Sequence, residues 1–141
     1  MLEIGIGMFG DLTFDQASQK FQPTSQKLRE IVEQVRLADD LGIDVIAIGE
    51  HHRPDYSVSS PEVILAALST VTKRIKLASG VTVLSSSDPV KVYQDFATVD
   101  LLSEGRAEII AGRGSFIESY PLFGYDLKDY ESLFEEKLDL L

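Results

Sequence analysis

The sequence predicts an α/β fold built from four consecutive βα units around a parallel sheet. Strand-like segments begin near residues 2, 43, 75 and 106, and a helix-like segment follows each of them. Tandem βα units pair their strands in parallel through right-handed crossovers. At about 35 residues per unit, eight units would need roughly 250 residues or more, the usual size of a (β/α)₈ barrel. The 141 residues therefore fit either half of a barrel or a complete doubly wound domain.

The second strand is the clearest element of the pattern. Residues 43–49 are nearly all apolar, which is typical of a parallel strand buried on both faces. The helix before it starts at Thr24 or Ser25 and places its apolar residues on one face at helical spacing. The first strand covers residues 2–8. The polar loop over residues 9–23 is long for a βα connection, and long loops are often functional.

Proline marks the starts of two further helices. Ser60-Pro61-Glu62 and Asp88-Pro89 place a capping residue before a proline, the favoured order at a helix start. The first of these helices is apolar almost all round over residues 63–71, so we expect it to be buried or packed against a second subunit. A fourth strand over residues 106–111 leads to a last amphipathic helix, which Asp129 is expected to cap.

Composition limits the class of protein and its partners. Hydrophobic residues make up 44% of the chain and charged residues 26%, and no apolar run reaches the ~18 residues of a membrane span. We therefore expect one domain over residues 1–141, located in the cytoplasm and not in a membrane. The formal charge of −10 disfavours nucleic acid and anionic lipid as partners. Without cysteine there is no thiolate nucleophile and no thiolate metal site.

The only two histidines lie where function is expected in either α/β architecture, at the C-terminal end of a strand. Glu50-His51-His52 follows the second strand, and adjacent residues there point to opposite sides. One imidazole is expected to face the mouth of the sheet, where it suits general-base work or hydrogen bonding to a ligand. Two hydrogen-bonded loop histidines fit equally well. Adjacent histidines rarely chelate one ion, so we expect no metal site.

Glycines mark two further strand ends. Gly80 interrupts the third strand, over residues 75–84, which indicates a bulge, a close approach to a flat ligand, or packing alone. Gly112-Arg113-Gly114 places a cation between two flexible residues, where arginine can grip a phosphate with two hydrogen bonds. A turn with a solvated arginine fits the same residues. The third glycine of the dinucleotide-binding fingerprint is missing here.

Taken in order, these motifs resemble the bacterial luciferase-like monooxygenase family of flavin-dependent oxidoreductases. The resemblance rests on Ile48-Gly49-Glu50-His51-His52, on the strand around Ser79-Gly80-Val81, and on Gly112-Arg113-Gly114. Its most specific part runs from Pro89 to Arg106, where Pro-Val-x-Val is followed by Asp-Leu-Leu-Ser-Glu-Gly-Arg. The similarity covers essentially all 141 residues.

The resemblance implies the N-terminal half of a (β/α)₈ TIM barrel rather than a doubly wound domain. In the family, four more βα units follow and supply further flavin contacts and much of the substrate pocket. We therefore expect the 141-residue chain to be an incomplete piece that is inactive alone. Its open strand edges would favour association.

The same resemblance assigns roles to residues of this chain. His51 matches the histidine that assists catalysis beside the flavin. Ser79, Gly80 and Val81 match the cofactor-binding segment, with a non-prolyl cis peptide at Gly80-Val81 under the isoalloxazine ring. Arg113 matches an arginine that reaches the flavin phosphate.

Two geometric expectations follow from these roles. The four strands should lie side by side in the order of the sequence, with helices outside. His51 and Arg113 should open onto one cleft beside Met8 and Ser79.

The activity that the resemblance implies is monooxygenation of a small organic substrate with reduced FMN and dioxygen. F420 is the alternative cofactor, a flavin reductase is a possible partner, and family members often dimerise through the second and third helices. Three rivals stay open. They are a hydride-transfer oxidoreductase using F420 or flavin, a flavin-binding protein without turnover, and a structural half-barrel without flavin.

Overall fold

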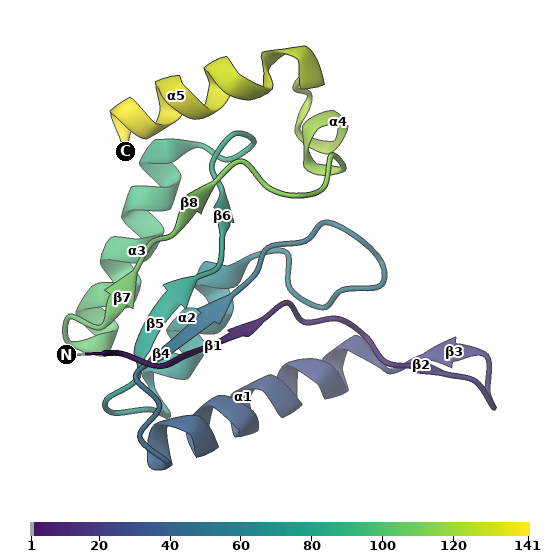
Figure 1. Cartoon of the computed structure of the whole chain (residues 1–141), viewed down its shortest axis with the longest axis vertical. Helices are drawn as coiled ribbons and strands as arrows, with labels where there is room; N and C mark the ends of the chain where they lie inside the picture. Colours follow the sequence, from purple (N-terminus) through teal and green to yellow (C-terminus); the bar gives the residue numbers. More distant parts are fainter. Residues whose placement is uncertain (1) are drawn as a thin grey trace.

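The computed structural model describes residues 2–141 and contains a four-stranded parallel sheet (Figure 1). Its strands, in spatial order, are β1 (Gly5–Met8), β4 (Val45–Ile48), β5 (Lys76–Ser79) and β7 (Ala107–Glu108). Spatial order follows chain order, as predicted for part of a barrel. A doubly wound sheet would instead reverse its strand order at a switch point. The expected order of the strands is confirmed.

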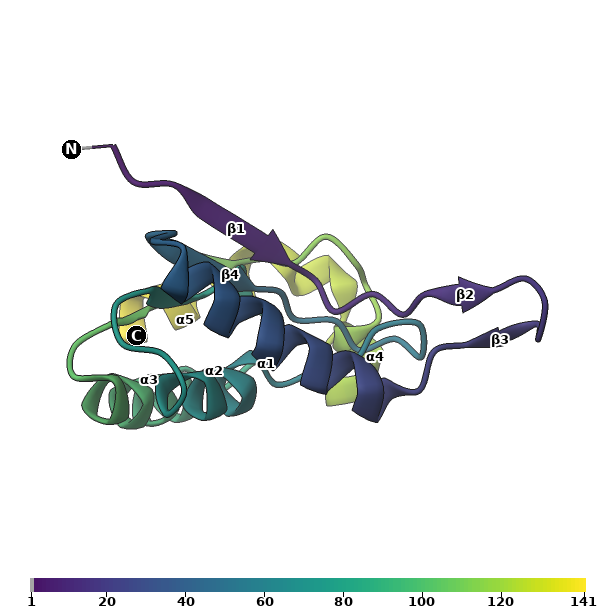
Figure 2. The same ribbon diagram turned by 90° about the horizontal axis from the view of Figure 1, so that it is seen from below.

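Three helices cover one face of this sheet. They are α1 (Thr24–Asp40), α2 (Pro61–Ser69) and α3 (Pro89–Ser103), and Figure 2 shows them on the same side of the strands. The chain then forms α4 (Ser119–Phe123), a 3₁₀ turn η1 (Leu127–Asp129) and α5 (Tyr130–Leu140), which packs beside α3. The other face of the sheet carries no helix within the described residues.

The central strand β4 shows how the two faces differ. Ile46 and Ile48 are fully buried and pack into the core that the sheet forms with its helices. Each such side chain contributes about 1.5–3 kcal/mol by leaving water. The alternate residues, Ala47 and Gly49, lie on the opposite face because side chains alternate along a strand. The same core includes residues of all three helices: Ile31, Val35, Leu65, Leu68, Val92, Phe96 and Val99.

Two strands expected to be continuous are each divided. The third strand splits into β5 and β6 (Thr82–Val83) around Gly80–Val81, whose peptide bond is cis, as expected from the resemblance. The fourth splits into β7 and β8 (Ala111–Gly112), and β8 pairs with β6 in parallel. The sheet therefore continues beyond β5 and β7 as a second, two-stranded ladder that β4 does not join.

Some local expectations were wrong. The loop over residues 9–23 contains a hairpin of β2 (Phe14–Asp15) and β3 (Lys20–Phe21), which no sequence signal predicted. Asp129 does occupy the N-cap position of α5, as expected, but its side chain makes no capping hydrogen bond. Asp126 caps the preceding turn η1 by accepting from the backbone N–H of Lys128 at 3.0 Å. The two capping positions are distinct because the chain makes the 3₁₀ turn η1 before α5 begins.

Asp39 joins the end of α1 to the start of β5. Its carboxylate accepts hydrogen bonds from the backbone N–H groups of Lys73, Arg74 and Ile75 at 2.8, 2.9 and 2.8 Å. Burial raises the pKa of Asp39, but these three donors favour the ionised form and hold its pKa below the ordinary value. The buried carboxylate is therefore stabilised by the same three backbone N–H groups whose turn it holds in place.

Arg106 closes the same end of the sheet from the other side. Its guanidinium donates to the carbonyl oxygens of Ser69, Thr72, Ile75 and Ser103 at 3.2, 3.3, 2.9 and 2.8 Å, and to Thr72 Oγ1 at 2.9 Å. These acceptors belong to the ends of α2 and α3 and to the entry of β5. One side chain thus holds together two helix ends and two strands.

We expect Arg106→Lys to destabilise the protein by at least about 2 kcal/mol, because a single ammonium cannot satisfy the buried carbonyls that a planar guanidinium reaches. The measurement is the free energy of unfolding from urea denaturation of the full-length protein. Arg36→Lys is the matched control, since Arg36 makes an exposed pair with Glu33 at 2.8 Å. Such a pair contributes less than about 1 kcal/mol. Equal effects of the two substitutions would contradict the role of Arg106.

Candidate functional site

The helix-free face of the sheet is lined by small residues near the C-terminal strand ends. Gly7, Ala47 and Ala78 lie in register across β1, β4 and β5. Gly49 and Gly80 continue this surface. A Cβ at Gly80 would lie 2.8 Å from Ala47 Cβ, and one at Gly49 would lie 2.7 Å from a ring carbon of Phe9. A side chain at either position would therefore collide with Ala47 or Phe9. Gly49 and Ala78 are themselves buried, so Gly7, Ala47 and Gly80 are the members of this surface that stay open.

An open volume lies beside this surface. A Cβ added at Gly7 would meet no atom of the described residues within 4 Å. A surface of glycine and alanine backed by sheet suits a planar, largely apolar ring, because such a ring gains contact over its whole face. We call the set Gly7, Ala47, Gly49, Ala78 and Gly80 the small-residue platform.

Four aromatic rings, one of them an imidazole, gather at the edge of the platform. The ring centroid of His51 lies 4.2 Å from that of Tyr56, 5.1 Å from Phe116 and 5.7 Å from Phe9. These residues come from the end of β1, the loop after β4 and the loop before α4. Phe9 and Phe116 remain half exposed, so the cluster presents an apolar surface at the mouth.

The loop that carries His51 is tied to the first βα loop. The carbonyl of Gly10 accepts from Ser57 N at 2.7 Å and from Ser57 Oγ at 2.8 Å. Leu12 N donates to Asp55 O at 2.9 Å, and His51 N donates to Val58 O at 2.9 Å. The His51 backbone is therefore fixed from both ends of its loop.

The environment of His51 favours the neutral imidazole. Burial lowers its pKa, Glu118 raises it, and Arg53 lowers it further, so the net pKa lies below the ordinary value of a histidine. The protein environment therefore disfavours protonation of the ring and favours its neutral form. A neutral ring can accept a proton or a hydrogen bond from a ligand.

Glu50, to which the sequence analysis assigned no role, is a buried carboxylate beside His51. Its Oε1 lies 2.8 Å from Nε2 of His52, and its Oε2 accepts from the backbone N–H of Val83 at 2.7 Å. The exposed fractions of the Glu50 and His52 side chains are 6% and 9%. The ring of His52 packs edge-on against Phe123 of α4, with centroids 5.1 Å apart.

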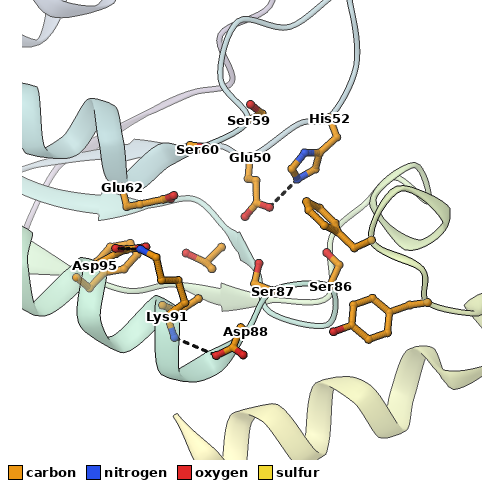
Figure 3. A pocket seen from close by; sticks show the side chains of 15 residues that line it. Glu50, His52, Ser59, Ser60, Glu62, Ser86, Ser87, Asp88, Lys91 and Asp95 are labelled. Carbon is orange, nitrogen blue, oxygen red and sulfur yellow. Dashed lines mark hydrogen bonds and ion pairs between the residues drawn. The ribbon is translucent and has the colours of Figure 1, made fainter.

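Glu50 and His52 face a polar cavity of about 510 Å³ on the helix side of the sheet (Figure 3). In Figure 3 the two side chains point toward each other, and Glu62 and Lys91 lie across the cavity. Burial raises the pKa of Glu62. The cavity is lined neither by His51 nor by the small-residue platform, so it is separate from the candidate site.

The residues expected to form one site occupy three places. His51 lies at the edge of the platform, and Gly80 forms part of it. Ser79 is fully buried; it pairs in register with Ile48 on the helix side, and its Oγ accepts from Ile110 N at 3.2 Å. Arg113 turns toward α5, with Nη2 3.0 Å from Glu131 and its guanidinium carbon 4.7 Å from the ring centre of Phe134.

The structure therefore does not bring Arg113 and His51 into one cleft. The side chain of Val81 packs against Gly112, since a Cβ added to Gly112 would lie 2.7 Å from Cγ2 of Val81. The aromatic neighbours of His51 were not predicted either. Phe9 and Tyr56 lie within or beside expected loops, and only their placement at strand ends could have drawn attention to them.

Within residues 2–141, every helix is too short or too polar to cross a lipid bilayer. Over the same residues, no group of three or more histidine, cysteine, aspartate or glutamate side chains is arranged to hold a metal ion.

Comparison with known sequences gives consistent relatives. A family model described as luciferase-like monooxygenase matches residues 8–141. The chain is 34% identical over 115 residues to limonene 1,2-monooxygenase of Rhodococcus erythropolis, covering 81% of this chain and 30% of that protein. It is 32% identical over 107 residues to the oxygenase component of the flavin-dependent trigonelline monooxygenase of Acinetobacter baylyi, covering 75% and 28%.

Solved structures with the same fold include two kinds of oxidoreductase. The oxygenating constituent of 3,6-diketocamphane monooxygenase of Pseudomonas putida, in complex with FMN, superposes with a TM-score of 0.83 at 22% identity, covering 98% of this chain and 38% of that one. An F420-dependent secondary alcohol dehydrogenase superposes at 0.71 with 20% identity, covering 98% and 41%. The chain thus spans between 28% and 41% of these four proteins. Its four βα units form the N-terminal half of a (β/α)₈ barrel.

We expect the NMR titration midpoint of His51 in the full-length protein to lie below about 6.5, the ordinary histidine value. Glu118→Gln should lower the midpoint further, because it removes a negative charge that favours the imidazolium. Arg53→Gln should raise it for the opposite reason. Lys20→Gln, on the remote hairpin, is the control and should leave it unchanged. If neither Glu118→Gln nor Arg53→Gln changes the titration midpoint, these two charges do not act on the His51 ring.

Proposed function

Because the chain belongs to the luciferase-like monooxygenase family, we propose that the full-length protein is a flavin-dependent monooxygenase that uses reduced FMN and dioxygen on a small organic substrate. The observation that carries the proposal is the small-residue platform with the ring of His51 at its edge. The platform fits the flat isoalloxazine ring, since any side chain larger than alanine there would hold the ring away from the sheet.

Reduced FMN, when bound, supplies the two electrons with which one atom of dioxygen enters the substrate and the other leaves as water. The residues of this chain bind, orient and shield. Gly80 and Ala47 let one face of the ring lie against the sheet. Phe9, Tyr56 and Phe116 present apolar surface at the mouth and keep water from the reacting atoms.

His51 is the proposed catalytic residue. Its imidazole stands at the edge of the platform, where its surroundings favour the neutral form, so it can take up a proton or hold a hydrogen bond at the ring or the substrate. Its fixed backbone and ring contacts limit the orientations that the imidazole can take.

Ser79, Gly80, Val81 and Arg113 are the proposed cofactor-binding residues. Ser79 acts from behind the platform, because its buried hydroxyl holds the backbone of Ile110. Arg113 would hold the phosphate only after exchanging Glu131 for it, which is favourable for a charge pair that is half exposed. Val81 borders the ring from the third strand.

Two partners belong to this proposal. A separate flavin reductase would supply the reduced FMN, as the name of the trigonelline oxygenase component suggests for that relative. A second copy of the protein would cover α2 and α3, whose exposed apolar residues include Val63, Val90 and Tyr93.

The structural likeness to an F420-dependent dehydrogenase favours a second candidate, hydride transfer with F420. A flavin-binding protein without turnover is the third. Dioxygen uptake by the full-length protein with reduced FMN, measured with and without substrate candidates, separates the three. Substrate-dependent uptake supports the monooxygenase, reduction of F420 by an alcohol supports hydride transfer, and tight FMN binding without either supports the binder.

We expect His51→Asn to lower kcat by about 10²–10⁴-fold, because asparagine keeps a hydrogen-bonding group but cannot take up a proton near neutral pH. The dissociation constant for FMN, measured by quenching of flavin fluorescence, should change by less than about threefold. A variant with wild-type kcat would remove His51 from the mechanism.

We expect Gly7→Val to weaken FMN binding by at least about tenfold, since an isopropyl group on the platform displaces the ring and its dispersion contacts. Stability should change little, because a Cβ at Gly7 meets no described atom. Ile6→Val, at the adjacent position on the other face, is the matched control and should bind FMN normally. Unchanged FMN affinity in Gly7→Val would place the flavin elsewhere.

A further inference from the structure

The two-stranded continuation of the sheet leaves one backbone group without a strand partner. Thr82 N and Leu84 N donate to Ile110 O and Gly112 O, both at 2.9 Å, on the β8 side. Backbone N–H groups alternate in direction along a parallel strand, so Val83 N points to the other side. There, β4 has already ended at Ile48.

The carboxylate of Glu50 takes the place of the missing strand. Its Oε2 accepts from Val83 N at 2.7 Å in a buried setting. A buried N–H without an acceptor costs about 1–3 kcal/mol, so this contact holds β6 against the chain that follows β4. Its second oxygen lies 2.8 Å from His52 Nε2, and His52 packs on Phe123 of α4. One side chain thus links three segments.

Glu50 stands between Gly49 of the platform and His51. Val83 lies two residues beyond the Gly80–Val81 peptide. The clamp from Glu50 to Val83 therefore spans the gap between the strand end that carries His51 and the segment that carries Gly80. The β4–β5 ladder ends with the hydrogen bond from Gly80 N to Ile48 O, at 2.6 Å. Within the described residues, no backbone hydrogen bond further along the chain joins the segment after β4 to residues 81–84.

We propose that Glu50 is a positioning residue, whose carboxylate replaces the strand pairing that β4 lacks and so fixes His51 relative to Gly80 and Val81. The part of this inference that concerns the flavin rests on the proposed function. The two contacts, to Val83 N and to His52 Nε2, require a side chain as long as that of glutamate with two hydrogen-bonding atoms at its end. They do not require a negative charge.

Three substitutions separate reach from charge. Glu50→Gln keeps an oxygen for Val83 N and an amide that can donate to a neutral His52. Glu50→Asp keeps the charge but is one methylene shorter, and Glu50→Ala removes both contacts. Glu33→Ala, on the exposed face of α1, is the control.

Two readouts need no cofactor. In the flavin-free full-length protein, amide hydrogen exchange at Val83 should be at least about tenfold faster in Glu50→Ala and Glu50→Asp, and within about twofold of wild type in Glu50→Gln. The NMR signal of the His51 ring should shift in the same two variants. If Val83 exchange or the His51 signal is unchanged in both Glu50→Asp and Glu50→Ala, the inference is overturned. Glu50→Asp supplies this comparison should Glu50→Ala not fold.

The remaining readouts use bound FMN. Glu50→Asp should lower kcat at least about fivefold with KM nearly unchanged and should alter the visible circular dichroism of the flavin, whereas Glu50→Gln should match wild type. If Glu50→Asp loses stability but keeps the wild-type kcat and flavin spectrum, Glu50 is only a structural residue and the proposal is overturned. A Glu50→Gln variant as impaired as Glu50→Asp would also overturn it. If wild type itself binds no flavin while the cofactor-free readouts respond as expected, the proposed function fails and the clamp on His51 stands.

Discussion

The two-sided character of β4 is the constraint on which the rest of the structure depends. Ile46 and Ile48 are fully buried in the core that the sheet shares with three helices, and their burial is the largest favourable contribution that this strand makes. The intervening Ala47 and Gly49 have small side chains on the other face, which lets Gly80 approach Ala47 closely and forms the surface on which we propose that the flavin lies. Both properties come from one alternation of large and small residues, so core stability and site shape are set by the same four residues, Ile46 to Gly49.

Much of this architecture could be predicted because it depends on patterns of residues that are close together in the sequence. Four βα units, the apolar strand over residues 43–49 and the proline-marked helix starts all depend on spacing within a few residues. The division of the third and fourth strands could not, since strands of two residues have no period to detect. The position of Asp129 at the start of α5 was predicted, but its lack of a capping hydrogen bond was not. Asp126 lies three residues earlier, and only the backbone turn decides which of the two acids caps with its side chain.

The candidate site was predictable in position but not in detail. His51 follows a buried strand, and that placement alone directed attention to it. The direction in which Arg113 turns depends on Glu131 and Phe134 of α5, which no pattern around Gly112 and Gly114 reveals. No role could be predicted for Glu50, because its partner Val83 is 33 residues away along the chain. Val83 contacts Glu50 through its backbone N–H, a group that every residue except proline carries, so the sequence gives no sign of the pairing.

The guanidinium of Arg106 has a consequence for the order in which the chain acquires its structure. Its acceptors on Ser69, Thr72 and Ile75 precede it by 31 to 37 residues, so these carbonyls have no such donor until the fourth strand has been made and docked. Contacts of such sequence separation form late, because the loop between them must first be closed. During synthesis, Asp39 can join α1 to β5 as soon as the third strand is made, whereas the helix ends that Arg106 holds gain their guanidinium donor only when the fourth strand docks.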